Sequence, residues 1–277
     1  MNLDITVLIF TRNERENLSR LLPYLARYIR QFVIIDAMST DGTKEICEKY
    51  GKVYETLPLG YADPCRMYGI SKVTTEWIFY LDADEYPSET LLKALPVIIR
   101  IAERKNYYAI KVRRINYIKP GKALKHLFQS DYQVRIFRKG CVEYKGVIHE
   151  QPYVKGKILI LDERFFILHK AYNTYSLKAI KKLLLYAKLA GLMRGNKKVS
   201  TIFVLGLPLT TFGRLIKYLI VKKGILDGLA GLEATLVYIL YLTLVDIFKA
   251  IRPARLDFVS QAISKGKDLN FLCKQVR

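Results

Sequence analysis

The sequence predicts an α/β fold with a mostly parallel central sheet, followed by a helical region. Short apolar, β-rich runs alternate with helix-like segments through the first hundred residues. These runs are uninterrupted by polar residues, which is typical of parallel strands covered by helices on both faces. From about residue 176 the apolar residues recur with a helical period. We therefore expect one domain over residues 1–195 and a helical, amphipathic region over 196–277.

The predicted elements of the first domain begin with a buried strand at 5–10, followed by the polar loop 11–14. Leucines at helical spacing then predict a helix over 16–30. A second buried strand at 32–35 leads into a polar turn at 36–43 that is rich in helix-capping residues. The next elements are helix, strand, helix and strand, in that order, at 43–50, 53–56, 63–73 and 77–81. Further strands are predicted at 107–118, 132–138 and 158–168.

The region after residue 176 begins with a basic amphipathic helix, in which leucines alternate with lysines. Beyond it, the longest uncharged stretches are 199–213 and 234–245. Both are shorter than the roughly 18–20 residues that a helix needs to span a membrane. The sequence therefore favours helices that lie on a membrane surface, with an ordinary helical subdomain as the alternative.

Charge is distributed unevenly along the chain. Residues 1–100 carry 12 Lys and Arg against 14 Asp and Glu, whereas the remaining residues carry 34 against 11. Such asymmetry favours an acidic partner: nucleic acid, anionic lipid or a phosphorylated substrate. The four cysteines show no metal-ligand spacing, and no signal-peptide pattern precedes the first predicted strand, so we expect reduced thiols in a cytosolic compartment.

Three polar segments follow predicted parallel strands, namely Thr11–Glu14, Asp36–Thr43 and Asp82–Glu85. Ligands of open α/β sheets bind beyond the carboxyl ends of such strands. Asp82 and Asp84 stand two residues apart and present hard oxygen ligands, which suit Mg²⁺ or Mn²⁺ bridging a diphosphate. An acidic pair alone is more often a helix cap or a solvated turn, so the three segments together carry the prediction.

These segments resemble glycosyltransferase family 2, whose members have the GT-A fold. The resemblance rests on Ile9-Phe10-Thr11-Arg12-Asn13-Glu14, on Ile35-Asp36-Ala37-Met38-Ser39-Thr40-Asp41-Gly42-Thr43 and on Leu81-Asp82-Ala83-Asp84-Glu85. The later segments 131–138 and 147–150 are similar to the branch that contains lipopolysaccharide-core glucosyltransferases. One departure is Ser130, where that branch commonly has an aromatic residue, and it leaves the sugar preference open.

The resemblance implies roles for individual residues. The residues implied to bind the nucleotide-sugar are Thr11, Asn13, Glu14, Asp36, Ser39, Arg66 and Asp82. The implied cofactor is Mn²⁺ or Mg²⁺, with Asp84 and Asp82 as ligands and His169 as a possible third. Contacts to the acceptor or diphosphate are assigned to His149, Gln133 and Arg135. A structural histidine is an equally good explanation of His149.

Inverting transferases require a carboxylate base that deprotonates the acceptor hydroxyl. Glu150 matches the place of that base, and Asp131 is the second candidate. The expected reaction moves a hexose from a nucleotide-diphosphate sugar to a hydroxyl of a lipid-linked or cell-surface glycan. UDP is the favoured carrier of the hexose. We expect the protein at the cytoplasmic face of the cell membrane, peripheral or monotopic, on anionic lipid.

Two alternatives remain. A polyprenyl-phosphate sugar synthase of the dolichyl-phosphate type would share the amino-terminal motifs, but its phosphate acceptor needs no base. A nucleic-acid-binding protein is suggested by charge and by tyrosines interleaved with basic residues. The acidic strand ends argue against it, because they would repel phosphate.

Overall fold

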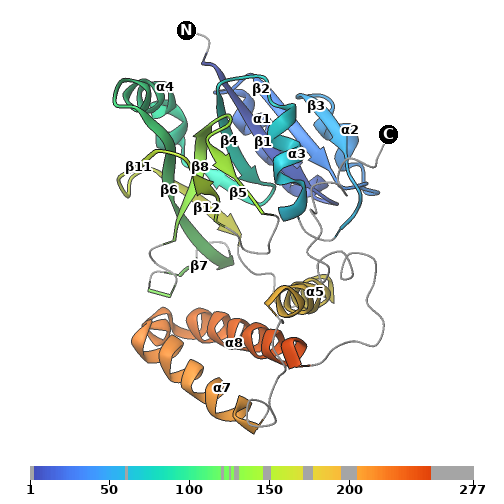
Figure 1. Cartoon of the computed structure of the whole chain (residues 1–277), viewed down its shortest axis with the longest axis vertical. Helices are drawn as coiled ribbons and strands as arrows, with labels where there is room; N and C mark the ends of the chain where they lie inside the picture. Colours follow the sequence, from blue (N-terminus) through green and yellow to red (C-terminus); the bar gives the residue numbers. More distant parts are fainter. Residues whose placement is uncertain are drawn as a thin grey trace. The chain divides into compact units, whose positions relative to one another are not determined.

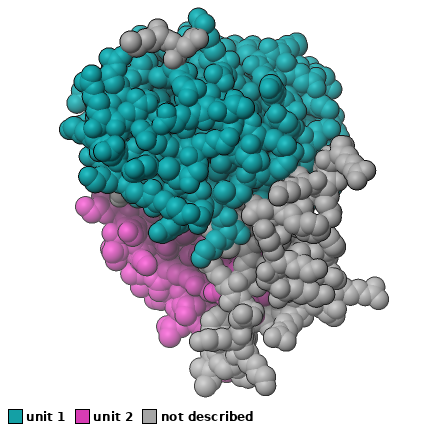
Figure 2. All heavy atoms as spheres, turned by 45° about the horizontal axis from the view of Figure 1, so that its top comes forward, with its two compact units in different colours: residues 1–114, 130–169, 268–277 teal, residues 115–129, 170–267 magenta. Residues whose placement is uncertain are grey.

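The structure is a computed structural model of the chain. It describes residues 3–59, 62–119, 122–124, 126–127, 131–145, 151–170, 177–194 and 205–250. The described residues form two compact units, coloured separately in Figure 2. The first unit contains residues up to 114 together with 131–169, and the second contains 115–127 and 170–250. The expected division at residue 195 stays a prediction, although the helix that precedes it groups with the later helices.

The first unit is built on a mixed sheet with the strand order β3-β2-β1-β4-β8-β6-β12-β5. The strands of its parallel half are β1 (Ile5–Thr11), β2 (Gln31–Asp36), β3 (Lys52–Glu55) and β4 (Trp77–Asp82). The antiparallel half contains β5 (Glu85–Pro87), β6 (Tyr107–Lys119), β8 (Tyr132–Arg138) and β12 (Phe166–Lys170). The shorter strands of this unit are β11 (Lys157–Ile160), which pairs with β6, and the separate pair β9 (Val142–Glu143) and β10 (Tyr153–Val154). Strand β7 (Lys122–Ala123) pairs with the end of β6 that belongs to the second unit.

Helices cover both faces of this sheet (Figure 1). The four helices of this unit are α1 (Arg15–Ala26), α2 (Thr43–Cys47), α3 (Arg66–Lys72) and α4 (Glu89–Arg104). Leucines of α1 and α4 pack with Val7, Ile9 and Phe79 on one face. On the opposite face, α3 packs against Leu8 and Tyr80. Alternate residues of each central strand thus face two separate cores, as the uninterrupted apolar runs predict.

The predicted strands and helices of the first hundred residues are confirmed, with ends shifted by a few residues. Two elements were missed: the short strand β5 and the helix α4, which contains Pro96. Ser88 caps α4, since its hydroxyl accepts a hydrogen bond from the Leu91 amide at 3.2 Å. The single strand predicted at 158–168 is divided into β11 and β12, because the Asp162 carboxylate stabilises a turn by accepting from the Arg164 amide.

The second unit is mainly helical, as predicted. Its helices are α5 (Leu177–Arg194), α7 (Leu207–Ile216) and α8 (Gly228–Ala250), with the π-helical turn η2 (Lys217–Val221) and the 3₁₀ turn η3 (Gly224–Asp227) between the last two. Close packing of α5 on α8 requires Gly191, where a Cβ atom would lie 2.6 Å from Cβ of Phe248. Within the described residues, one helical stretch, Gly224–Lys249, is long and apolar enough to cross a membrane.

The cysteines depart from expectation at one position. Cys47 and Cys141 carry free thiols, but Cys65 is disulfide-bonded. The expectation of four reduced thiols is therefore wrong at Cys65. Spacing along the chain does not show which cysteines the fold brings together.

Candidate functional site

The three polar loops meet at one edge of the sheet because the strands before them are parallel and in register. Thr11 is paired with Asp36 across β1 and β2, and Phe10 is paired with Asp82 across β1 and β4. The first residues of all three loops therefore lie side by side at the carboxyl ends of adjacent strands. The observed register thus places the three predicted loops at the sheet edge where ligands of such folds bind.

The first two loops are joined by hydrogen bonds through Ser39. The Ser39 hydroxyl accepts from the Asn13 amide at 2.8 Å and donates to the Asp36 carboxylate at 2.5 Å. The same carboxylate accepts from the Ser39 amide at 2.8 Å, and the Thr40 amide donates to the Asn13 side chain at 2.8 Å. Asn13 and Met38 adopt left-handed backbone conformations, with φ of 54° and 52°. These bonds fix the shape of the edge next to β1.

Glu14 and Thr11 complete this part of the edge. The Glu14 amide donates to the Thr43 hydroxyl at 3.0 Å, so the start of α1 is tied to the start of α2. The Thr11 hydroxyl is buried, and the part of the chain that the structure describes offers it no hydrogen-bond partner. A buried hydroxyl in that situation is usually satisfied by a water molecule or a ligand.

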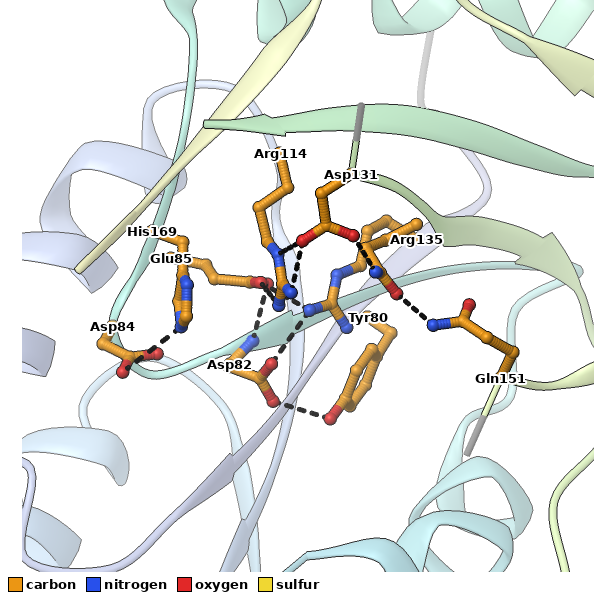
Figure 3. A network of polar contacts seen from close by, with 10 residues as sticks. Tyr80, Asp82, Asp84, Glu85, Arg114, Asp131, Arg135, Gln151 and His169 are labelled. Carbon is orange, nitrogen blue, oxygen red and sulfur yellow. Dashed lines mark hydrogen bonds and ion pairs between the residues drawn. The ribbon is translucent and has the colours of Figure 1, made fainter. Parts of the chain in front are cut away.

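Asp82 is held at the centre of a polar network (Figure 3). Its carboxylate accepts a hydrogen bond from the Tyr80 hydroxyl at 2.7 Å and one from the Arg135 guanidinium at 2.9 Å. Glu85, which is fully buried, forms an ion pair with Arg135 and accepts from the Asp82 amide at 3.2 Å. Arg135 is itself 5% exposed. A buried cation thus binds both carboxylates and fixes the direction of the Asp82 side chain.

The network continues to Asp131 and beyond it. Arg114 donates to the Asp131 carboxylate at 2.7 Å and lies 3.5 Å from Glu85. Gln133 donates to the other Asp131 oxygen and accepts from Gln151 at 2.7 Å. The second candidate base is therefore engaged by an arginine and an amide.

Electrostatics differ between the two central carboxylates. Burial alone would raise the pKa of Asp82, but the charges of Arg135 and Arg66 hold that pKa well below its usual range. Burial raises the pKa of Glu85, and Arg135 only partly opposes the rise. Asp82 is therefore ionised at neutral pH. Burial also raises the pKa of the Tyr80 hydroxyl, which stays a hydrogen-bond donor to Asp82.

Asp84 and His169 come together because β5 pairs with β12. Residue 169 is opposite Glu85 in that pairing, and Nε2 of His169 lies 3.8 Å from an Asp84 carboxylate oxygen. No group of three or more His, Cys, Asp or Glu side chains within the described ranges is arranged to hold a metal ion. A pair of protein ligands still fits Mn²⁺ or Mg²⁺ in a nucleotide site, because substrate phosphates and water supply the remaining ligands there.

Arg66, at the start of α3, lies between two aromatic rings. Its guanidinium carbon is 4.8 Å from the centroid of Tyr144 and 5.4 Å from that of Tyr80. Stacked arginines keep a fixed plane for phosphate or base recognition. The Tyr80 ring centroid also lies 4.8 Å from the Arg135 guanidinium carbon, so both arginines contact the same ring.

The structure thus brings most of the predicted residues to one edge. His149 and Glu150 lie outside the described residues, so the predicted base stays a prediction. Sequence reasoning missed Glu85 and Arg114 as members of the network. Glu85 directly follows the acidic pair, which was a usable signal, whereas nothing in the sequence connects Arg114 with Asp131.

Comparison with known proteins settles the family. The sequence pattern of "Glycosyl transferase family 2" matches residues 6–184, which is most of the chain. The chain belongs to glycosyltransferase family 2. The match to the lipopolysaccharide-core branch stays a prediction.

Two relatives of this family 2 glycosyltransferase share less than a third of their aligned residues with it. An uncharacterized glycosyltransferase of Rickettsia felis is 22% identical over 206 residues, which is 71% of this chain and 72% of the relative. The glycosyltransferase SunS of Bacillus subtilis is 29% identical over 157 residues, 53% of this chain but 34% of that protein.

Solved structures confirm the GT-A fold. The mannosyltransferase PcManGT from Pyrobaculum calidifontis, solved in complex with GDP-Man and Mn²⁺, has a TM-score of 0.50 and 13% identity. The similarity covers 91% of this chain and 88% of that one.

Proposed function

We propose that this glycosyltransferase moves a hexose from a nucleotide-diphosphate sugar to a hydroxyl of a lipid-linked or cell-surface glycan, with inversion. The observation that carries the proposal is the sheet edge where the loops after β1, β2 and β4 meet, next to Asp84 and His169. UDP is the carrier we favour. GDP is the alternative, since PcManGT was solved with GDP-Man and Mn²⁺.

Donor binding falls to the loops after β1 and β2. The buried Thr11 hydroxyl, with its unsatisfied hydrogen-bonding capacity, supports a ligand contact there. Asp36 and Ser39 are oriented by their mutual bonds, and Asn13 and Glu14 are tied to the same loop. Arg66, stacked on tyrosines, offers positive charge to the nucleotide. These positions are proposed nucleotide contacts.

Asp84 and His169 are the residues that would hold Mn²⁺ or Mg²⁺, with Asp82 beside them. Such an ion would neutralise charge that develops on the nucleoside-diphosphate leaving group. The chain's own part is to keep Asp82 ionised and fixed, which Arg135 and the Tyr80 hydroxyl accomplish.

The acceptor hydroxyl must lose a proton as it attacks the anomeric carbon. We assign this proton to the Glu150 carboxylate and keep Asp131 as the second candidate. The new carbon–oxygen bond forms on the face opposite the departing diphosphate, so the anomeric configuration inverts. Asp131 is the weaker candidate because Arg114 and Gln133 already bind its oxygens, which leaves them less accessible to an acceptor hydroxyl.

The decisive experiment measures thermal stabilisation and donor hydrolysis with UDP- and GDP-hexoses, with Mn²⁺, with Mg²⁺ and with a chelator. We expect one donor to stabilise the protein in a metal-dependent way and Asp84→Ala to abolish turnover. Glu48→Ala removes an exposed carboxylate of the first unit and serves as the matched control. Undiminished turnover by Asp84→Ala in chelator would refute the proposal.

A polyprenyl-phosphate sugar synthase is the second candidate. It is favoured by the excess of 34 Lys and Arg over 11 Asp and Glu after residue 100, which suits a phosphorylated lipid acceptor. Both enzymes would act at a membrane, and we place the protein peripherally at its cytoplasmic face. The apolar helical stretch Gly224–Lys249 supports membrane association.

A further inference from the structure

Two apolar stripes run along the helices of the second unit and face solvent. The first stripe consists of Leu209, Phe212, Ile216 and Ile220, on α7 and η2. The second stripe consists of Leu229, Leu232, Leu236 and Leu240, on α8. Both follow the same spacing of three, four and four residues, so each stripe occupies one side of its helix. Their exposed fractions reach 76% at Leu209 and 82% at Leu229.

The polar groups of these helices point toward each other instead. The Thr211 and Thr243 hydroxyls are 3.1 Å apart, and Arg214 binds the Asp246 carboxylate at 2.5 Å. A helical pair in water normally buries its apolar side and exposes its polar side. Here α8 buries Ala234, Ile239 and Val245, but α7 and α8 also share polar contacts and expose leucines, which is the arrangement expected where one side of the pair meets an apolar medium.

The exposed charges on this part of the chain are positive. Over residues 205–250, the ionisable side chains that are exposed are Lys217, Lys222 and Lys223. The carboxylates are engaged within the unit: Asp227 accepts from the amides of His126 and Leu127, and Asp246 binds Arg214 and Lys249. The exposed surface therefore combines apolar stripes with lysines, and the carboxylates of that range are partly buried (Asp227 and Glu233) or buried (Asp246).

We propose that the two stripes insert into the acyl boundary of an anionic lipid surface, with Lys217, Lys222 and Lys223 at the headgroups. This inference deepens the membrane location proposed above by naming the surface and the lipid charge. A second copy of the chain is the less suitable occupant, because each copy carries a net charge of +21 and the two would repel.

The helices lie along the surface and do not span the bilayer. A spanning α8 would carry Glu233 and Asp246 into hydrocarbon, where each carboxylate is strongly unfavourable. An interfacial helix leaves Asp246 away from the acyl chains and Glu233, which borders the second stripe and is partly buried, at the level of the headgroups, while leucines enter to a depth of about 5–10 Å. Val221, Ile225 and Leu226, at the turn between α7 and α8, are all more than half exposed and extend the same surface.

The test is flotation of the purified full chain with phosphatidylcholine vesicles, with and without phosphatidylglycerol. We expect the parent to float with the anionic vesicles. The stripe variant Leu209→Ser/Phe212→Ser/Ile216→Ser should bind at least tenfold more weakly, since each side chain loses its burial in the acyl layer. Val97→Ser/Ile101→Ser, which changes exposed apolar residues of α4, is the matched control and should float like the parent.

A second variant tests the lysines. Lys217→Gln/Lys222→Gln/Lys223→Gln should lose about fivefold in affinity per lysine for anionic vesicles and little for neutral ones. Lys49→Gln/Lys52→Gln/Lys105→Gln, on the exposed surface of the first unit, should match the parent. A loss of affinity for anionic vesicles in the Lys217/Lys222/Lys223 variant alone supports the proposal. Equal losses in this variant and in the control variant overturn the assignment of the surface.

Three outcomes overturn the proposal: a parent that does not float, a stripe variant that floats like the parent, or a concentration-dependent dimer that the stripe variant abolishes without any lipid binding. Donor-induced thermal stabilisation is measured on the same proteins without lipid. If a stripe variant fails to float but is still stabilised by the donor, the stripes act in lipid binding and not in donor binding. If the parent floats but no donor stabilises it, the result counts against the proposed function and not against the lipid-binding surface.

Discussion

The sheet edge of the first unit and the helix pair of the second break the usual rule of burial in opposite directions. At the sheet edge, Glu85 and Arg135 are charged side chains removed from water. On the helix pair, Leu209 and Leu229 are apolar side chains left in water. Neither arrangement is explained by stability alone. We propose a partner for each region, a nucleotide-sugar at the sheet edge and lipid at the helix pair.

The largest effect expected at the sheet edge concerns the base. Glu150→Gln should lower transfer roughly a hundredfold to ten-thousandfold, because the acceptor hydroxyl keeps its proton. Asp131→Asn is the parallel variant, since its carboxylate is already bound by Arg114. Transfer is measured with the donor found in the screen. A loss only in Asp131→Asn would make Asp131 the base, and full activity of both variants would favour a phosphate acceptor.

Removal of the buried cation should have the next largest effect. Arg135→Met leaves Asp82 and Glu85 without their shared partner, so the free energy of unfolding should fall by about 3–5 kcal/mol. Chemical denaturation measures this. Arg164→Met removes an exposed arginine whose pair with Asp162 contributes at most about 1 kcal/mol. Equal losses in the two variants would show that the buried network does not stabilise the fold.

The second unit offers a smaller effect. The Asp227 carboxylate accepts from the Leu127 amide at 2.7 Å and from the His126 amide at 3.0 Å. Asp227→Ala removes the acceptor from both amides and should cost about 1–3 kcal/mol. Hydrogen exchange should speed up at residues 126–127. An unchanged exchange rate there would show that the carboxylate does not hold this segment. Asp227→Asn keeps one acceptor oxygen, so its exchange rate should lie between those of the parent and Asp227→Ala.

The smallest effect is a pH dependence, because the Asp82 side chain is 34% exposed. Its pKa is lower in the folded protein than the ordinary value of about 3.9, so its ionised form stabilises the fold above that pH. This contribution is lost as the pH falls through the lowered pKa. The difference in unfolding free energy between the parent and Asp82→Asn should therefore be largest at neutral pH and shrink below about pH 4. A constant difference would contradict the lowered pKa.

The local sequence pattern was sufficient to predict the strands in the parallel half of the sheet. Strands β1, β2 and β4 are uninterrupted apolar runs, and their ends were predicted within two residues. Parallel register then placed Thr11, Asp36 and Asp82 together without any knowledge of the rest of the chain. The family resemblance added the role of each residue.

The antiparallel half was less accessible to sequence reasoning. Strand β5 has three residues, and its pairing with β12 is specified by long-range packing. The contact of Arg135 with Asp82 and Glu85 depends on the order β4-β8-β6, which no local pattern encodes. The length of uncharged runs also understated the helical stretch Gly224–Lys249, because the isolated charges of Glu233 and Asp246 interrupt a segment that is otherwise strongly apolar.

The pairing of β5 with β12 has a consequence for biosynthesis. Asp84 emerges from the ribosome early, but His169 reaches it only after the whole antiparallel half has been made and β12 has added to the edge. A nascent chain that stops before β12 contains the residues of β1, β2 and β4, yet it lacks half of the proposed ion-binding pair. The proposed pair is therefore complete only in a chain whose translation has passed residue 169.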